Sequence, residues 1–154
     1  MMFITHLAFG FLVALLTMTL IEVPNQSIFI LAVIFGAALA DLDKMSSRIG
    51  SKIKPLSFLL ELLFGHRGLM HTIYIPIAIF IVISLFGYPV VGFAFLIGFI
   101  SHLLIDSLTT TGISFLRPFN NLHLKGFIKT GGILEYALLA TILVFIAITI
   151  NNVF

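Results

Sequence analysis

The sequence contains no cysteine and very little charge. Without cysteine, disulfide bonds and thiolate metal sites are excluded, so any metal ligand must be a histidine or a carboxylate. Charged residues make up 9% of the 154 residues, and hydrophobic residues make up 60%. Because a soluble domain has about one quarter charged residues, this composition predicts an integral membrane protein with a single domain over residues 1–154. The net charge of +2 is small, and we expect no nucleic-acid partner.

Five apolar stretches stand out, and four of them are long enough to be membrane helices. They cover residues 3–21, 27–40, 69–86, 88–108 and 132–150. A spanning helix needs about 20 residues, and the second stretch approaches that length only if the helix includes Asp41 and Asp43; a re-entrant segment is the alternative. The first stretch lacks a basic N-terminal region and a cleavage site, which favours a retained helix over a signal peptide. The sequence therefore predicts an all-α integral membrane bundle with about five transmembrane helices.

The basic residues indicate an orientation for this bundle. All eight Lys and Arg residues lie in two long connections, 44–68 and 109–131. The positive-inside rule places both connections in the cytoplasm, together with the N-terminus. Within the first connection, the apolar run at 55–64 predicts a short interfacial helix. We therefore expect a multi-pass protein of the cell (inner) membrane, with the lipid bilayer as its surroundings.

On this topology, the ionisable groups of the helices gather at the cytoplasmic side. They are His6, Asp41, Asp43, His66, His71, His102, Asp106 and Glu135. His102 and Asp106 stand four residues apart, so they share one helix face. Ionisable groups inside a membrane usually face the bundle interior and mark function. A divalent metal would offset the carboxylate charge, and several histidines and carboxylates at one depth could hold two ions.

Each of these residues also has a purely structural interpretation. His102 and Asp106 could form an intrahelical hydrogen bond, and the two aspartates after residue 40 could simply end a helix at the headgroups. Glu135, in a first helical turn, suits the helix dipole. His123 lies in a polar connection, where a surface role is the simpler interpretation. The functional interpretation rests on the joint occurrence of these groups on one side of the membrane.

The motifs THLAFG, DLD, HRGLMH, SHLLIDSLTTTG and RPF together resemble a known family. They resemble the YdjM-like group of LexA-regulated, inner-membrane-associated metal-dependent hydrolases, over nearly the whole chain from His6 to Glu135. That family is regarded as distantly similar to zinc-dependent phospholipases C and single-strand nucleases, which are helical enzymes with zinc clusters. The chain lacks the N-terminal tryptophan and the second late histidine–carboxylate pair of those soluble enzymes.

The resemblance implies roles for individual residues. His102 and Asp106 match the HxxxD pair whose aspartate bridges metals. The remaining metal ligands would come from His6, Asp41 or Asp43, and His66 or His71. Two zinc ions are the expected cofactors, with manganese or iron as alternatives.

On this basis we expect a membrane-bound metal-dependent hydrolase that acts on an amphiphilic, phospholipid-like phosphoester at the cytoplasmic face. Asp43 or Glu135 would accept a proton, and the substrate would be bound by Arg67, Thr110, Thr111 and Arg117. The alternative is a protein that binds or transports a metal without catalysis. Transport requires polar groups at several depths, and the outer halves of the predicted helices have almost none.

Overall fold

The computed structural model describes residues 1–43, 71–117, 119, 120 and 122–153, and for residues 42 and 43 the backbone only. In these ranges the chain is all-α and contains no strand, which confirms the predicted fold class. The elements are α1 (Phe3–Leu20), α2 (Gln26–Leu39), the 3₁₀-helix η1 (Ala40–Asp43), α4 (Tyr74–Leu85), α5 (Pro89–Ser107) and α6 (Ile133–Val153). The predicted interfacial helix at 55–64 lies outside the described residues.

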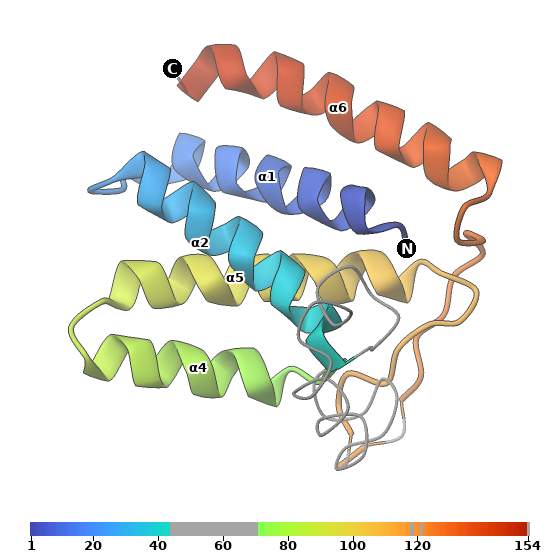
Figure 1. Cartoon of the computed structure of the whole chain (residues 1–154), viewed down its shortest axis with the longest axis horizontal. Coiled ribbons are helices and arrows are strands. Elements are labelled where there is room, and N and C mark those ends of the chain that lie inside the picture. Colours follow the sequence, from blue (N-terminus) through green and yellow to red (C-terminus); the bar gives the residue numbers. More distant parts are fainter. Residues whose placement is uncertain (44–70, 118, 121, 154) are drawn as a thin grey trace.

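Helix α5 lies in the middle of the bundle (Figure 1). Helices α2 and α4 pack against it, and α1 contacts α2, α5 and α6. The start of α1, the end of α5, η1 and the starts of α4 and α6 all lie at the same end of the bundle. The topology therefore brings together residues that are far apart in the sequence.

Three of the described helices, α1, α5 and α6, are long and apolar enough to cross a membrane. Helix α2 is shorter, but η1 extends it through Asp43, as the sequence predicted. In the described part of the third predicted stretch, residues 71–86, the α-helix covers Tyr74–Leu85, so the prediction of its length was wrong. Its start is delayed because the backbone N–H of Ile73 donates to the carbonyl of Phe115 at 3.0 Å, and Pro76 suits the first turn of a helix.

The turn between α4 and α5 depends on one glycine. Gly87 has a φ of 88°, a conformation that a residue without a Cβ adopts readily. Its N–H donates to the carbonyl of Ser84, and the N–H of Tyr88 donates to that of Ile83. This is a Schellman motif, which ends α4. Pro89 then begins α5, because its fixed φ suits the first helical position.

Helices α2 and α5 approach each other at two glycines. A Cβ on Gly98 would lie 2.0 Å from the carbonyl oxygen of Val33, and a Cβ on Gly36 would lie 2.3 Å from that of Phe95. Any larger residue would force the two backbones apart. The close approach brings the end of α2 against the last turns of α5, where His102 and Asp106 lie.

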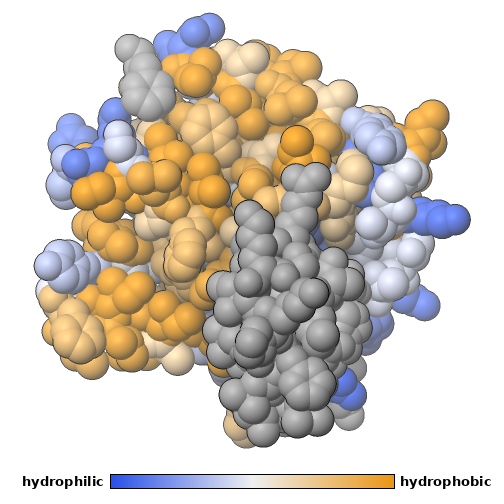
Figure 2. Space-filling model, in the orientation of Figure 1, coloured by the Kyte–Doolittle hydropathy of each residue, from blue (hydrophilic) through white to orange (hydrophobic). Residues whose placement is uncertain are grey.

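Apolar side chains cover most of the visible face of the helices (Figure 2). Exposed large hydrophobic residues occur on every described helix. On α6, Leu143, Val144 and Phe145 are all more than half exposed. Hydrophilic residues gather near the edges of the view, where helices end and where the 109–131 connection runs. This distribution is what a helical bundle in lipid requires.

Candidate metal centre and adjoining pocket

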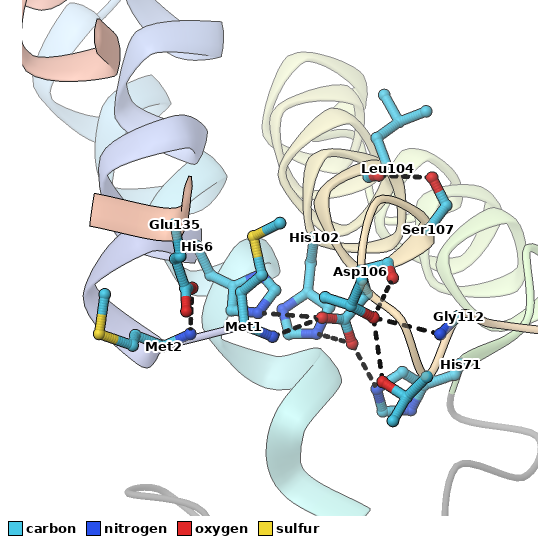
Figure 3. A network of polar contacts seen from close by, with 12 residues as sticks. Met1, Met2, His6, His71, His102, Leu104, Asp106, Ser107, Gly112 and Glu135 are labelled. Atoms are coloured by element: carbon cyan, nitrogen blue, oxygen red, sulfur yellow. Dashed lines mark hydrogen bonds and ion pairs between the residues drawn. The ribbon is translucent and has the colours of Figure 1, made fainter. Parts of the chain in front are cut away.

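Asp106 lies at the centre of a cluster of histidines (Figure 3). Its Oδ1 is 3.4 Å from Nε2 of His6, and its Oδ2 is 3.7 Å from Nε2 of His102 and 3.9 Å from Nε2 of His71. All four residues are buried, with at most 3% of their surface exposed. They come from α1, α5 and the turn before α4, so tertiary packing assembles the cluster.

The orientation of His102 is fixed by the close approach of α2 and α5. Its Nδ1 lies 2.8 Å from the carbonyl oxygen of Ala37. Because a carbonyl oxygen can only accept, Nδ1 must be the protonated nitrogen, which leaves a lone pair on Nε2 of the neutral ring. Within the described residues, Nε2 has no hydrogen-bond partner although it is buried. A histidine that binds a metal characteristically donates its other N–H to a carbonyl or carboxylate in this way.

His6 lies flat against His102. The two rings stack with centroids 3.8 Å apart and planes 10° apart. In the described part of the chain, Nδ1 of His6 is also a buried nitrogen without a hydrogen-bond partner. A buried imidazole nitrogen without a hydrogen-bond partner is unfavourable, and two such nitrogens on adjacent rings indicate a site for a ligand such as a metal ion.

The donor distances fit a divalent metal ion. A tetrahedral zinc site with bond lengths of about 2.0–2.1 Å separates its ligand atoms by about 3.3–3.4 Å. The nitrogen–oxygen distances of 3.4–3.9 Å around Asp106 are close to that spacing, and they exceed the length of a strong charge-assisted hydrogen bond, about 2.7–2.9 Å. His71, His102 and Asp106 each offer a ligand atom within 4.8 Å of the others. The chemistry and the spacing of these ligand atoms therefore fit a metal ion.

A second group of ligand atoms combines His6 and His102 with Asp41, which is half-buried in η1. The two groups share His102, whose Nδ1 is engaged with Ala37, so Nε2 of His102 serves one ion only. The side chain of Asp43 and all of His66 and Arg67 lie outside the described residues. The expectation of two ions thus stays a prediction.

The amino group of Met1 also contacts this cluster. It lies 2.8 Å from Oδ1 of Asp106, on the same oxygen that faces His6 (Figure 3). The ammonium group places a positive charge against the buried carboxylate. Asp106 is thus a site that attracts cationic groups in the bundle interior.

Glu135 joins the start of α6 to the start of α1. It is fully buried, and its two oxygens accept backbone hydrogen bonds from Met2 and from Gly131, both at 2.6 Å. These bonds hold the segment that leads into His6. Each oxygen of Glu135 keeps a second lone pair that could accept a proton, and its role in proton transfer stays a prediction. The observed contacts are those of a residue that positions the backbone.

A polar pocket of about 270 Å³ adjoins the histidine cluster. His71 belongs to both, and the other polar side chains of the lining are Thr111, Ser114, Arg117 and His123. The pocket thus contains two of the predicted substrate-binding residues. Thr110 is not part of this lining; it is exposed, and its backbone N–H donates to the carbonyl of Ile128.

The sequence predicts a surface position for His123, and its exposure in the structure confirms this. His123 also lines the polar pocket. Its Nε2 lies 3.1 Å from the carbonyl oxygen of Thr111 and its Nδ1 lies 2.9 Å from Oγ of Ser114. Since the carbonyl accepts, Nε2 carries the proton and Nδ1 accepts from the serine hydroxyl. His123 therefore holds the two sides of the 109–131 connection together. A polar connection gives no periodicity that would have revealed this contact.

Comparison with known proteins agrees with a membrane role. A family model described as YdjM inner membrane protein matches residues 1–153. The uncharacterized protein YvsG of Bacillus subtilis (strain 168) is 32% identical over 107 residues, covering 68% of this chain and 67% of YvsG. The inner membrane protein YdjM of Escherichia coli (strain K12) is 31% identical over 94 residues, covering 55% of this chain and 46% of that protein.

The matched region therefore spans about two thirds of YvsG and less than half of the Escherichia coli protein. No solved structure matches it, and the expected distant similarity to zinc-dependent phospholipases C stays a prediction. The full-length family match and the apolar helices identify a membrane protein. The chain belongs to the YdjM inner membrane protein family.

Proposed function

We propose that this protein is a membrane-bound, metal-dependent hydrolase of phosphoesters. The observation that supports the proposal is the position of His71, which belongs both to the buried cluster around Asp106 and to the wall of a polar pocket that contains Arg117. A structural metal site is normally closed by four protein ligands. A cluster that borders a pocket would bring a bound substrate next to one metal ligand, His71.

The charges of the proposed metal site and of the polar pocket are complementary to a phosphoester. His6, His71, His102 and Asp106 would hold the ion, and Asp41 is a further ligand. A divalent ion held there would supply a Lewis acid for water and for a phosphoryl oxygen. Arg117 carries a permanent positive charge on a planar fork that matches phosphate oxygens. The hydroxyl of Thr111 also lies at the pocket wall. Because the hydroxyl of Thr109 donates to the carbonyl of Asp106, Thr111 donates to Thr109 at 3.0 Å and would have to turn to donate to a phosphate oxygen.

The proposed reaction is hydrolysis of one phosphorus–oxygen bond. The oxygen of a water molecule forms a bond to phosphorus, and the ester oxygen leaves with the electron pair of the broken bond. One water proton is transferred to the leaving oxygen, so the products are an alcohol and a phosphate with one fewer ester bond. A carboxylate would hold that proton in transit, and Asp43 and Glu135 are the predicted candidates.

The proposed chemistry would take place near one membrane surface. The cluster lies at the end of α5 next to the 109–131 connection, which contains Arg117, Lys125 and Lys129. The positive-inside rule assigns that end to the cytoplasm. A phosphoester at this depth would be a component of the bilayer or an amphiphile that enters it.

Metal analysis combined with a substrate panel tests the proposal. The protein, purified in lipid nanodiscs, should contain divalent metal and should hydrolyse a phosphodiester or phospholipid. Chelation should abolish the turnover, and added Zn²⁺ or Mn²⁺ should restore it. His71→Ala should lower both metal content and rate, whereas the matched control His123→Ala should keep the metal. Stoichiometric metal without turnover of any phosphoester would contradict the hydrolase and favour a non-catalytic metal-binding protein.

A further inference from the structure

The polar pocket has an apolar neighbour. A second pocket, of about 120 Å³, lies between the end of α5 and the 109–131 connection. Its lining includes Leu103, Leu104 and Ser107 of α5 and Ile113, Phe115 and Leu124 of the connection. Ile113 lines both pockets, so the polar and the apolar pocket meet at this residue.

A single antiparallel bridge lies between the two pockets. Ile113 and Leu124 form an antiparallel bridge, with N–H to carbonyl distances of 2.8 and 2.9 Å. In extended chain, successive side chains point to opposite sides. Ser114 and His123 accordingly line the polar pocket, while Phe115 and Leu124 line the apolar one. The alternation of polar and apolar residues in this bridge therefore builds a polar and an apolar surface back to back.

The apolar pocket reaches the exposed surface of the bundle. Leu104 is 56% exposed on α5, and Leu124 is 41% exposed. Helix α5 is one of the helices that can cross a membrane. A hydrocarbon chain in the bilayer could thus enter at Leu104 and end next to the polar pocket. The pocket is partly lined by the buried residues Leu103 and Ile113, so its inner end is shielded from lipid.

We propose that this apolar pocket, whose lining includes Ser107 and Ile113, binds one hydrocarbon chain of the substrate while the phosphate lies at Arg117. The inference rests on the proposed function and adds that the substrate is an amphiphile whose chain is recognised by the protein. An apolar cavity of about 150 Å³ holds a benzene-sized ligand, so a pocket of about 120 Å³ takes a short section of chain. The remainder of the chain would lie along Leu104 in the bilayer.

Binding of alkylphosphonates, which are not hydrolysed, tests this inference. Ethylphosphonate and hexylphosphonate are titrated into the metal-loaded protein in nanodiscs, with empty nanodiscs as the reference for partitioning into lipid. Each fully buried methylene strengthens binding about fourfold. We therefore expect hexylphosphonate to bind wild type at least tenfold more tightly than ethylphosphonate, after correction for partitioning.

Ser107→Phe should fill the pocket and remove most of this preference, while ethylphosphonate binds as to wild type. Thr141→Phe is the matched control, because Thr141 is an exposed hydroxyl residue on α6 that also bonds to its own helix. It should keep the wild-type ratio. Should Ser107→Phe lower the melting temperature, Leu104→Ala on the exposed rim replaces it, with an expected three- to fivefold lower ratio.

The outcomes separate this inference from the hydrolase itself. A hexyl-to-ethyl ratio near one in wild type, or an unchanged ratio in both pocket variants, would refute the chain-binding pocket even if phosphoesters are hydrolysed. A chain preference that Ser107→Phe removes would support the pocket even if turnover were absent. In that case the hydrolase would fail and the pocket would stand as a binding site for an anionic amphiphile.

Discussion

Replacing Asp106 by asparagine changes the charge of the cluster and little else. The side chain keeps its size and shape, but it no longer offers an anionic ligand to the groups around it. In the structure, Asp106 faces the Nε2 atoms of His6, His71 and His102 at 3.4–3.9 Å. It is the shared neighbour of all three rings. Asp106→Asn should therefore weaken metal binding more than any change outside the cluster.

The expected effect follows from linkage between binding and folding. A metal ion at 100 times its dissociation constant stabilises the folded protein by about 2.7 kcal/mol. For a chain of this size each kcal/mol raises the melting temperature by about 2–4 °C, so the metal-dependent shift should be about 5–11 °C. Loss of a residue that merely orients a ligand weakens affinity by about 10–100-fold, and loss of a ligand should cost at least 100-fold. The variant would then retain about 0.4 kcal/mol, or about 1–2 °C, at the same metal concentration.

Thermal unfolding in nanodiscs, with chelator and with added metal, measures this difference. Metal content is determined on the same samples. Glu22→Gln is the control, because it removes a carboxylate from the exposed connection between α1 and α2. It should show the full wild-type shift. A metal-dependent shift in Asp106→Asn equal to that of wild type would refute the assignment of Asp106 as a ligand.

Further predictions address the fold, the pocket and the topology. Gly98→Ala would place a Cβ 2.0 Å from the carbonyl oxygen of Val33, so it should lower the free energy of unfolding by about 1–3 kcal/mol; unchanged thermal stability would contradict the close approach of α2 and α5. Arg117→Lys keeps the charge but loses the fork, so metal content should stay constant while phosphoester turnover falls about tenfold, or about 1.4 kcal/mol; equal rates would remove Arg117 from the substrate site. Because the chain has no cysteine, Thr130→Cys and Gln26→Cys each give a unique labelling site. Impermeant maleimide should label Thr130→Cys only from the cytoplasm and Gln26→Cys only from outside. Labelling of both variants from the same side would refute the proposed topology.

The helices could be predicted because their signals are local. Long apolar stretches give α1, α5 and α6, and Pro89 sets the start of α5. The i,i+4 pair of His102 and Asp106 could be recognised for the same reason, since helical periodicity alone puts the two residues on one face. The helix over Tyr74–Leu85 is shorter than its apolar stretch because Ile73 bonds to Phe115. That contact joins residues 42 positions apart, and the sequence near Ile73 contains no sign of it.

The contacts of the candidate site residues were harder to predict than the residues themselves, because their partners lie in other segments of the chain. Charge and position identified Glu135 as a candidate. They did not predict that its two oxygens accept hydrogen bonds from the backbone N–H groups of Met2 and Gly131. The exposed position of His123 was predicted correctly, but its contacts with Ser114 and with the carbonyl of Thr111 were not. Side-chain type indicates what a residue can do, whereas its backbone partners decide which of these roles it can take.

His102 shows why such partners are invisible in a sequence. Its usefulness as a ligand depends on which nitrogen carries the proton, and the carbonyl of Ala37 determines that. Every residue has a carbonyl, so no residue type signals this role. The relevant signal lies instead in Gly36 and Gly98, which let α2 and α5 approach until Ala37 meets His102. Glycines in membrane helices are commonly explained by packing alone. Here the same close packing fixes the tautomer of a buried histidine, so a substitution such as Gly98→Ala should disturb metal affinity as well as stability, although neither glycine is a candidate ligand.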